Sequence, residues 1–451
     1  MYRNRLKNLE LWASASKHKP LIIRGARQVG KSTLVSLFAE ESAYDLLVLN
    51  FERNPEYADL FIDNNPEKIV SLLELQFNQR IKQGKTLLFL DEIQAEPQVL
   101  KTLRYFYEEM PDLHIVAAGS LLDFELNAPT YSIPVGRVSY MHLHPMGFTE
   151  FLLATGKHKL AEFIQNYQLN DSLADVIHQT LLAQFKTFVA VGGMPEVVAM
   201  YAKTGSFKQC EVLKQDLLAT FQNDFSKYAG NINTSLIRKV FSKVPTLIGN
   251  KIKYSNLLPE YKAAQVSKII DLLSDAGVIQ KVIRTSANGV PLAAEANHKF
   301  FKLVFLDIGL VSSILNLTHQ ALEADDLIMV NSGSLAEQWI GQALLLNQPH
   351  NQQPELHYWA REKKSSSAEL DYVSTILNKV IGIEVKAGKT GTLKSLHLFI
   401  KEKSPPLTVR FSLQKPSVLT DPKLLSLPLY FAEEFYRLGN KALGTPTTLE
   451  Y

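Results

Sequence analysis

A phosphate-binding loop near the N-terminus constrains this chain more than any other feature. Residues 21–41 read LIIRGARQVGKSTLVSLFAEE: a short apolar run, a turn bracketed by two glycines, and an amphipathic helix. Gly25 and Gly30 enclose four residues, and Lys31 and Ser32 follow directly, which completes the GxxxxGKS spacing. Glycines let backbone N–H groups turn around a phosphate, the lysine reaches the β and γ oxygens, and the serine hydroxyl ligates Mg²⁺. A chance glycine turn is the weaker interpretation.

The helix that follows the loop adds the positive end of its dipole to the predicted phosphate site. The residues predicted to bind nucleotide are Gly25, Ala26, Arg27, Gln28, Val29, Gly30, Lys31, Ser32 and Thr33.

Two carboxylates end a strand that lies further along the chain. The run KTLLFLDEIQ (85–94) is apolar until Asp91 and Glu92, as expected of a buried strand in a parallel sheet. Asp91 then lies at the carboxyl end of the strand, where it holds the water shell of Mg²⁺, and Glu92 orients the attacking water. The alternative is that both residues only open the next helix.

Two further polar residues are weaker candidates. Ser120 ends the strand in HIVAAGSLL (114–122), where it either senses a γ-phosphate or caps a helix. Arg137 follows a glycine in an apolar stretch; it is either a cation directed at the γ-phosphate of its own or a neighbouring subunit, or a surface arginine on a hairpin. Alternating strands and helices over residues 1–155 predict a three-layer α/β fold with a parallel sheet and a nucleotide at the carboxyl ends of its strands.

These motifs resemble those of a bacterial and archaeal family of AAA+ ATPases. The shared patterns are Arg27-Gln28 inside the loop, LNFE at 49–52, LDEIQ at 90–94, AGSLL at 118–122 and a GR…P…F…EFL pattern from Gly136 to Leu152. The resemblance implies an AAA+ core over residues 1–155, followed by a helical lid. It also implies binding and hydrolysis of ATP with Mg²⁺, carried by Lys31, Ser32, Asp91 and Glu92. Members of the family usually carry a C-terminal domain of unknown function, so the resemblance leaves the biological role open.

The expected helical lid covers residues 156–230. The segment reads as helices, with GGMPEVV (192–198) between two of them. Gly193 and Pro195 are similar to the Gly-x-Pro element by which some signal-transducing ATPases touch nucleotide phosphates, so Pro195 joins the predicted nucleotide-binding residues. The alternative is a plain loop between two packed helices.

Residues 231–318 predict a winged-helix domain. Two helices (234–246 and 263–279) precede a hairpin whose turn contains Asn288-Gly289, a strong turn signal. The window holds 11 Lys and Arg against 5 Asp and Glu, a local excess of +6 in a chain with a net charge of +3. The residues predicted to contact DNA phosphates are Lys262, Lys268, Lys281 and Arg284. The alternative is a module for packing or oligomerisation.

The C-terminal segment, residues 319–451, carries an ordered set that resembles the PD-(D/E)xK nuclease core. A helix with Glu337 precedes one strand with Asp371 and another with Glu384 and Lys386. Because side chains alternate along a strand, Glu384 and Lys386 share a face, and a hairpin brings Asp371 to them. Glu337, Asp371 and Glu384 would hold a second Mg²⁺ or Mn²⁺, and Lys386 would steady a hydroxide or developing charge. The alternative is a charged strand face on an ordinary α/β domain.

Composition limits the remaining classes. Lys and Arg number 48 against 45 Asp and Glu, so a nucleic-acid surface has to be local. The single cysteine, Cys210, excludes intrachain disulfides and cysteine zinc clusters. The N-terminus has no apolar signal core, and no run approaches the roughly 18 apolar residues of a membrane span. We therefore expect a soluble, cytoplasmic protein without membrane contact.

Two functions fit these patterns. The leading hypothesis is an ATP-driven machine in which the nucleotide state controls a metal-dependent nuclease acting on DNA. The second is a regulatory switch that binds ATP and presents its C-terminal domain to a protein partner or to DNA without cleaving it. A transporter-type or metabolic NTPase would leave the basic window unexplained. Relatives in the resembling family often form rings, which makes a homo-oligomer with Arg137 acting in trans a further expectation.

Overall fold

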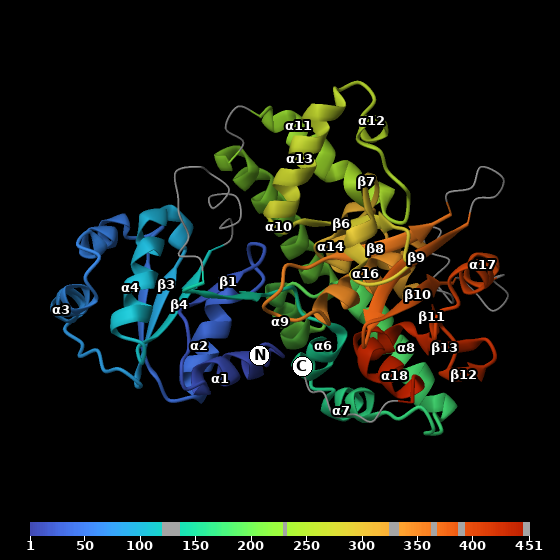
Figure 1. Ribbon diagram of the computed structural model, residues 1–451, viewed down its shortest axis with the longest axis horizontal. Coiled ribbons are helices and arrows are strands. Elements are labelled where there is room, and N and C mark those ends of the chain that lie inside the picture. The colour runs from blue at the N-terminus through green and yellow to red at the C-terminus, as the bar shows by residue number, and fades with distance from the viewer. Residues whose placement is uncertain (120–135, 229–231, 324–332, 362–367, 387–392, 445–451) are drawn as a thin grey trace.

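The computed structural model describes residues 1–119, 136–228, 232–323, 333–361, 368–386 and 393–444. Figure 1 shows an N-terminal α/β unit, a larger mixed sheet towards the C-terminus, and helices between and above them. Ser120, one of the predicted phosphate sensors, lies outside the described residues. No helix in the described part of the chain is both long and apolar enough to cross a membrane.

The N-terminal sheet has five strands in the order β2-β3-β4-β1-β5, and every pair in it is parallel. Its strands are β1 (Leu21–Arg24), β2 (Asp45–Asn50), β3 (Thr86–Asp91), β4 (His114–Ala118) and β5 (Ser139–His142). The helices that pack on it are α1 (Leu6–Ser14), α2 (Lys31–Glu41), α3 (Pro66–Phe77) and α4 (Thr102–Glu109). The prediction of an α/β fold with a parallel sheet is confirmed for this region.

Alternation along β1 explains how the sheet separates two helical layers. Leu21 and Ile23 belong to the apolar core that contains Phe38 of α2, whereas Ile22 belongs to a different core that contains Leu103 of α4. Successive side chains of a strand point to opposite faces, so a fully apolar strand is buried on both sides. Because all five strands are parallel, their carboxyl ends meet at one edge, where the phosphate loop and Asp91 lie.

A long helical segment follows the sheet. Its helices are α6 (Phe148–Ala154), α7 (His158–Asn166), α8 (Asp175–Val191), α9 (Pro195–Thr204), α10 (Phe207–Tyr228), α11 (Thr234–Lys243), α12 (Tyr254–Leu257) and α13 (Ala263–Asp275). Two short helices from further along the chain, α14 (Ile308–Ile314) and α15 (Thr318–Glu323), pack against α8.

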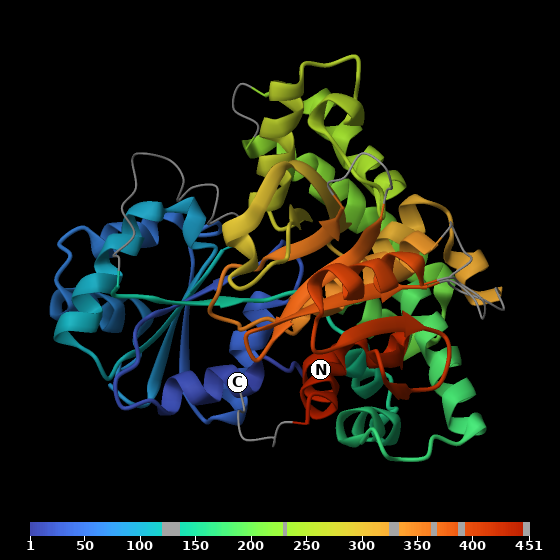
Figure 2. The same cartoon turned by 45° about the vertical axis from the view of Figure 1, so that its right-hand side comes forward.

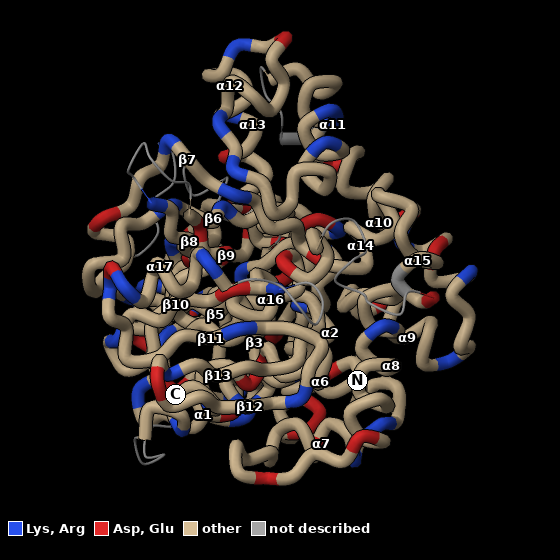
Figure 3. Tube along the Cα trace, turned by 90° about the vertical axis from the view of Figure 1, so that its right-hand side faces the viewer, with Lys and Arg blue, Asp and Glu red and all other residues tan. Residues whose placement is uncertain are grey.

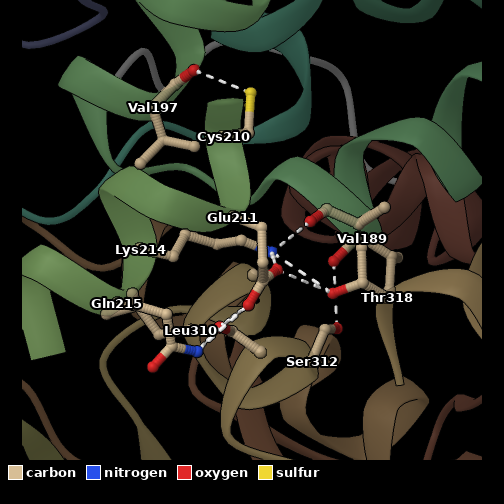
Figure 4. Close-up of polar contacts among 12 residues, drawn as sticks. Val189, Val197, Cys210, Glu211, Lys214, Gln215, Leu310, Ser312 and Thr318 are labelled. Atoms are coloured by element: carbon tan, nitrogen blue, oxygen red, sulfur yellow. Dashed lines mark hydrogen bonds and ion pairs between the residues drawn. The ribbon is translucent and has the colours of Figure 1, made fainter. Parts of the chain in front are cut away.

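A buried polar cluster ties α10 to these neighbours (Figure 4). Lys214 Nζ donates to Ala190 O at 2.8 Å and to Thr318 Oγ1 at 3.3 Å, and lies 2.8 Å from Glu211 Oε2. Burial by itself raises the pKa of Glu211, but the hydrogen bonds from Lys214 and Ser313 lower it to about 2. A buried charge is tolerated only when it is paired and hydrogen-bonded, so this cluster fixes α10 against α8, α14 and α15.

The C-terminal sheet has eight strands in the order β12-β13-β11-β10-β9-β8-β6-β7. They are β6 (Ile279–Thr285), β7 (Ala296–Phe305), β8 (Leu356–Ala360), β9 (Glu369–Ile376), β10 (Lys379–Val385), β11 (Thr408–Ser412), β12 (Ser417–Thr420) and β13 (Lys423–Pro428). Figure 2 brings this sheet forward.

The hairpin predicted as a wing is part of this sheet. β6 pairs with β7 in antiparallel fashion and with β8 in parallel, in a register that places Val282 opposite Leu356. Every residue of β8 is buried, so both faces of the sheet are covered at this strand, and β8 pairs with β6 on one side and β9 on the other. The sheet thus crosses the predicted boundary between residues 318 and 319, and the structure does not confirm a separate winged-helix domain.

Helices cover both faces of the eight-stranded sheet. They are α16 (Ser334–Leu346) on one face and α17 (Lys394–Lys403) on the other, and the described chain ends with α18 (Phe435–Ala442). Trp339 of α16 packs against Phe185 and Phe188 of α8, with ring centroids 5.7 Å and 4.9 Å apart. One apolar core therefore continues from the N-terminal sheet through α8 to α16 and the C-terminal sheet. On the opposite face, Trp359 of β8 packs on Phe399 of α17.

Candidate functional site

The phosphate loop leaves β1 and enters α2 through backbone angles that favour glycine. Gly25 has φ +149° and Gly30 has φ +90°, and Gln28 between them has φ +66°. A Cβ on Gly25 would lie 2.2 Å from the backbone oxygen of Leu143, so no side chain fits there. The glycine spacing thus serves both the turn and its close packing against the segment after β5.

Lys31 directs its ammonium back over the loop. Its Nζ donates to the backbone oxygens of Gly25 at 3.0 Å and Ala26 at 2.9 Å. Burial lowers the pKa of Lys31 to about 8, although Glu92 and Asp91 favour its charged form. A buried cation at the first turn of α2 is suited to a phosphate that brings negative charge to the loop.

The metal-binding pair predicted from sequence meets in the structure. Ser32 Oγ lies 3.0 Å and 3.1 Å from the two carboxylate oxygens of Asp91, and Asn50 Nδ2 donates to Asp91 Oδ2 at 3.2 Å. Burial, followed by the charge of Glu92, raises the pKa of Asp91. A hydroxyl beside a carboxylate at the carboxyl end of a parallel strand is a donor set that fits Mg²⁺, a hard cation that takes oxygen ligands.

Glu92 lies beside this pair in an unusual backbone conformation. Its φ of +51° is in the left-handed region, which residues other than glycine rarely adopt. The side-chain amide of Gln94 donates to Glu92 Oε2 at 2.5 Å. The turn directs Asp91 and Glu92 differently: Asp91 lies against Ser32, and Glu92 is held by Gln94.

Residues from three distant segments hold the loop in place. Arg3 Nη1 donates to Val29 O at 2.7 Å, and its Nη2 donates to His144 O at 2.7 Å. Arg27 of the loop pairs with Asp224 of α10 at 2.7 Å. The sequence offered little signal for Arg3, because one buried arginine among several basic residues of an N-terminal helix looks like its exposed neighbours.

The predicted Gly193–Pro195 turn does reach the phosphate loop. A Cβ on Gly30 would lie 3.5 Å from Pro195 Cγ, which places the proline against the loop. Gly193 packs so closely on Met146 that a Cβ would lie 2.0 Å from the Met146 oxygen, and Met146 N donates to Gly193 O at 2.7 Å. The turn is therefore fixed by the segment that precedes α6, while its proline contacts the loop.

Asp307 connects this turn to the C-terminal region. This fully buried carboxylate lies between β7 and α14 and caps α14: its Oδ1 accepts from the N–H groups of Gly309 at 2.9 Å and Leu310 at 3.1 Å. Its Oδ2 accepts from Gly193 N at 2.6 Å and from Gln342 Nε2 at 3.4 Å. Gln342 lies on α16, so a short series of contacts runs from the phosphate loop to that helix.

Arg137 does not approach the phosphate loop of its own chain. It precedes β5, and β5 runs parallel to β1, so Arg137 lies at the edge of the sheet opposite the loop. Its Nε is 2.8 Å from Glu108 Oε1, and its guanidinium lies over the ring of Tyr107. A role in trans stays a prediction.

The predicted C-terminal residues lie close together. In the β9–β10 hairpin, Ile383 pairs with Tyr372, which puts Glu384 across from Asp371, and Asp371 Oδ2 accepts from Val385 N at 2.7 Å. Lys386 Nζ is 2.5 Å from Glu384 Oε1.

Glu337 of α16 joins this group through a cation that the sequence reasoning missed. Lys302 Nζ from β7 lies 3.4 Å from Glu337 Oε2, 2.7 Å from Glu369 Oε1 and 3.5 Å from Asp371 Oδ1. The available signal was a lysine inside the apolar run FFKLVF, since a charge in a buried strand requires a partner. Among the described residues, no three Asp, Glu, His or Cys side chains are arranged to hold a metal ion.

Burial and the charge of Asp371 raise the pKa of Glu337 to about 8 and that of Glu384 to about 7. Both pKa values exceed those of an unfolded chain, so the folded protein retains protons that the unfolded chain releases near pH 4.3.

The free energy of unfolding is therefore expected to fall as the pH rises from about 4.5 to about 8, by on the order of 1 kcal/mol or more. Urea unfolding across this range measures the slope. Glu337→Gln should flatten it, and an equal slope in both proteins would contradict the assignment.

A basic cleft opens on the hairpin side of the sheet. Its volume is about 920 Å³, and its lining includes Lys253, Arg284, His298, Lys299 and Phe300. Lys253 and Arg284 both lie over the ring of Phe300, at 5.0 Å and 5.7 Å.

Of the four predicted DNA contacts, only Arg284 lines this cleft; Lys281 pairs with Asp271 on α13. Figure 3 shows that Lys and Arg predominate around α11, α13 and β7.

A phosphate loop at the carboxyl edge of a five-stranded parallel sheet, with Ser32 and Asp91 in contact, defines a nucleotide-binding protein of the phosphate-loop class. A family model described as an AAA domain matches residues 17–152, the part of the chain that holds the phosphate loop and the five-stranded sheet. Two models described as domains of unknown function match residues 182–321 (DUF8612) and 332–430 (DUF4143).

No curated protein matches the chain. Among solved structures, the Thermotoga maritima RuvB Holliday junction branch migration motor has a TM-score of 0.30 and 16% identity, over 62% of this chain and 90% of that one. The Aeropyrum pernix ORC1 protein in complex with DNA has a TM-score of 0.27 and 12% identity, over 72% of this chain and 93% of its own. With TM-scores this low, neither similarity carries an argument about function.

Proposed function

We propose that the protein is a Mg²⁺-dependent ATPase whose nucleotide state is transmitted to its C-terminal domain. The observation that supports the ATPase best is the contact between Ser32 and Asp91 at 3.0 Å and 3.1 Å, next to the buried ammonium of Lys31. These groups match the parts that phosphoryl transfer requires: a cradle with a cation, a metal-holding pair, and a carboxylate for the attacking water.

Each residue of the site has a distinct task. The backbone from Gly25 to Thr33 cradles the phosphates, and Lys31 contributes positive charge to the β and γ oxygens. Ser32 and Asp91 would hold Mg²⁺, and the bound ion would supply positive charge against the charge that develops on the phosphates. Glu92 orients and deprotonates the attacking water.

The connection from Pro195 to α16 supports transmission to the C-terminal domain. Pro195 lies against Gly30 of the loop, Gly193 donates to Asp307, and Asp307 accepts from Gln342 of α16. Bound nucleotide occupies the space beside Gly30, so the Pro195 turn differs between the empty and the loaded protein. Because Asp307 and α16 shift together with that turn, the C-terminal domain presents one surface with ATP and another without it. This is the behaviour of a regulatory switch that holds a protein or DNA partner according to nucleotide state.

Glu92→Gln is the test of hydrolysis. The amide retains the size of the carboxylate but cannot take a proton, so turnover should fall by about 10²-fold or more while ATP still binds. Phosphate release under saturating ATP and the Kd of a fluorescent ATP analogue separate the two effects. Glu109→Gln, an exposed change at the end of α4, is the matched control. Unchanged turnover in Glu92→Gln would exclude the proposed role.

The second candidate function is a metal-dependent nuclease acting on DNA in the cytoplasm. It is favoured by the convergence of Asp371, Glu384 and Lys386 and by the cleft with two cations over Phe300, since cations and aromatic rings bind backbone phosphates and bases. Glu337, Asp371 and Glu384 are the ligands that would hold Mg²⁺ or Mn²⁺ in this reading.

The test of the nuclease is direct. Purified protein is incubated with Mg²⁺ or Mn²⁺, ATP, and plasmid or single-stranded DNA. Cleavage that Asp371→Ala abolishes, and that Lys253→Glu weakens through lower DNA affinity, is expected under this function. Absence of cleavage under every condition, or equal cleavage by Asp371→Ala, would reject it and leave the switch.

A further inference from the structure

The ammonium group of Lys302 lies among the carboxylates that were predicted to bind a metal ion in the C-terminal domain. Lys302 Nζ contacts Glu369 at 2.7 Å, Glu337 at 3.4 Å and Asp371 at 3.5 Å, and 3% of its side chain is exposed. Two of these carboxylates, Glu337 and Asp371, belong to the three predicted metal ligands of this domain. An ammonium group has three N–H donors and no acceptor, so one lysine serves one carboxylate with each donor.

Two further lysines lie at the edge of the cluster. Lys251 Nζ lies 2.5 Å from Glu369 Oε2, and Lys386 Nζ lies 2.5 Å from Glu384 Oε1. Three ammonium groups therefore face four carboxylates, and each carboxylate contacts at least one of them. A divalent ion added to this set would give an excess of positive charge in a buried region. A divalent ion in place of Lys302 would balance it.

The three oxygens around Lys302 Nζ lie at 2.7–3.5 Å, within the range of ion pairs to an ammonium group. Glu384 is 2% exposed, and its Oε2 is buried without a hydrogen-bond partner in the structure. Glu384 thus has one oxygen paired with Lys386 and one without a partner among the described residues, while Glu337 and Asp371 contact Lys302.

We propose that Lys302 is the resident cation of this cluster and keeps divalent metal out of the C-terminal domain. The carboxylates of Glu337 and Asp371 are retained to hold the lysine and to join β7, β9 and α16. Mg²⁺ or Mn²⁺ enters only when Lys302 is removed. This inference concerns the same carboxylates as the second candidate function and opposes it: the domain is a nuclease-like scaffold that does not cleave while Lys302 is in place.

The test is a titration of Mn²⁺ into the nucleotide-free full-length protein, with free Mn²⁺ measured by electron paramagnetic resonance. The wild type should show no saturable site in the C-terminal domain. Lys302→Met, which keeps the length of the side chain without the charge, should gain one saturable Mn²⁺ site per chain. The double variant Lys302→Met with Asp371→Asn should lose it. Lys251→Met, which removes a lysine from the outer oxygen of Glu369, is the matched control and should gain no site.

Two results would overturn the inference. One is a Mn²⁺ site in the wild type that Asp371→Asn abolishes, because metal would then bind with Lys302 in place. The other is a folded Lys302→Met protein without a new site. The comparison of the wild type with Asp371→Asn leaves Lys302 unchanged, so the inference remains testable if Lys302→Met does not fold. Any Mn²⁺ that binds near Asp91 binds equally to all variants, so it does not affect the comparison between them. The titration does not measure ATP turnover. A failure of this inference can therefore be distinguished from a failure of the ATPase proposal.

Discussion

Lys31→Ala is expected to reduce kcat/KM for ATP by at least about 10²-fold. The Lys31 ammonium is fixed by the backbone oxygens of Gly25 and Ala26, at the place where the loop turns around a phosphate. Alanine leaves the loop glycines and the Ser32–Asp91 contact intact but removes the positive charge. Because burial already lowers the pKa of Lys31 to about 8, the charge is costly to keep in the empty protein. Its loss should therefore leave the fold as stable as before.

Steady-state phosphate release gives kcat and KM, and thermal unfolding without nucleotide reports on stability. Lys68→Ala is the matched control, since Lys68 is an exposed lysine that pairs with Asp63 at the surface. Added ATP should raise the melting temperature of the wild type and of Lys68→Ala but not of Lys31→Ala. A Lys31→Ala protein with wild-type turnover would show that this loop does not bind the reacting nucleotide.

Asp307→Ala should lower the free energy of unfolding by about 3 kcal/mol. Three backbone N–H groups, those of Gly193, Gly309 and Leu310, lose their acceptor in a region without access to water. Each unsatisfied buried donor costs about 1 kcal/mol or more. Urea unfolding measures the loss, and Asp216→Ala, an exposed aspartate on α10, should change stability by less than about 0.5 kcal/mol.

Asp307→Asn separates the two tasks of this carboxylate. The amide oxygen can still accept from Gly309 and Leu310 and cap α14, but the amide nitrogen then faces Gly193 N and Gln342 Nε2, which are both donors. We expect a smaller loss of stability than in Asp307→Ala and a weaker coupling of nucleotide binding to the C-terminal domain. Protection of α16 from hydrogen exchange, with and without ATP, reports on that coupling. Equal nucleotide-dependent protection in the wild type and Asp307→Asn would exclude this route.

The nucleotide site was predictable because its residues are close in sequence or follow a strand of recognisable pattern. GxxxxGKS specifies its own turn, and an apolar strand that ends in Asp91 and Glu92 reaches the same sheet edge as the loop whenever the strands are parallel. The Asp371–Glu384 pair was predictable for a similar reason, since a hairpin sets its own register. Arg137 shows the limit: its position opposite the loop depends on where β5 joins the sheet, which no local pattern specifies.

The sequence by itself determined the phosphate loop, the carboxylates of β3 and the charged face of β10, because spacing and alternation place those side chains without knowledge of distant segments. Only the tertiary structure decided what surrounds them. It joined the predicted wing to the C-terminal sheet, placed Arg3 and Pro195 on the phosphate loop, and inserted Lys302 among the carboxylates. The physical reason is that strand pairing and burial of charge are settled by partners far apart in the chain, and a lysine in an apolar strand finds its carboxylates only after the strands have paired.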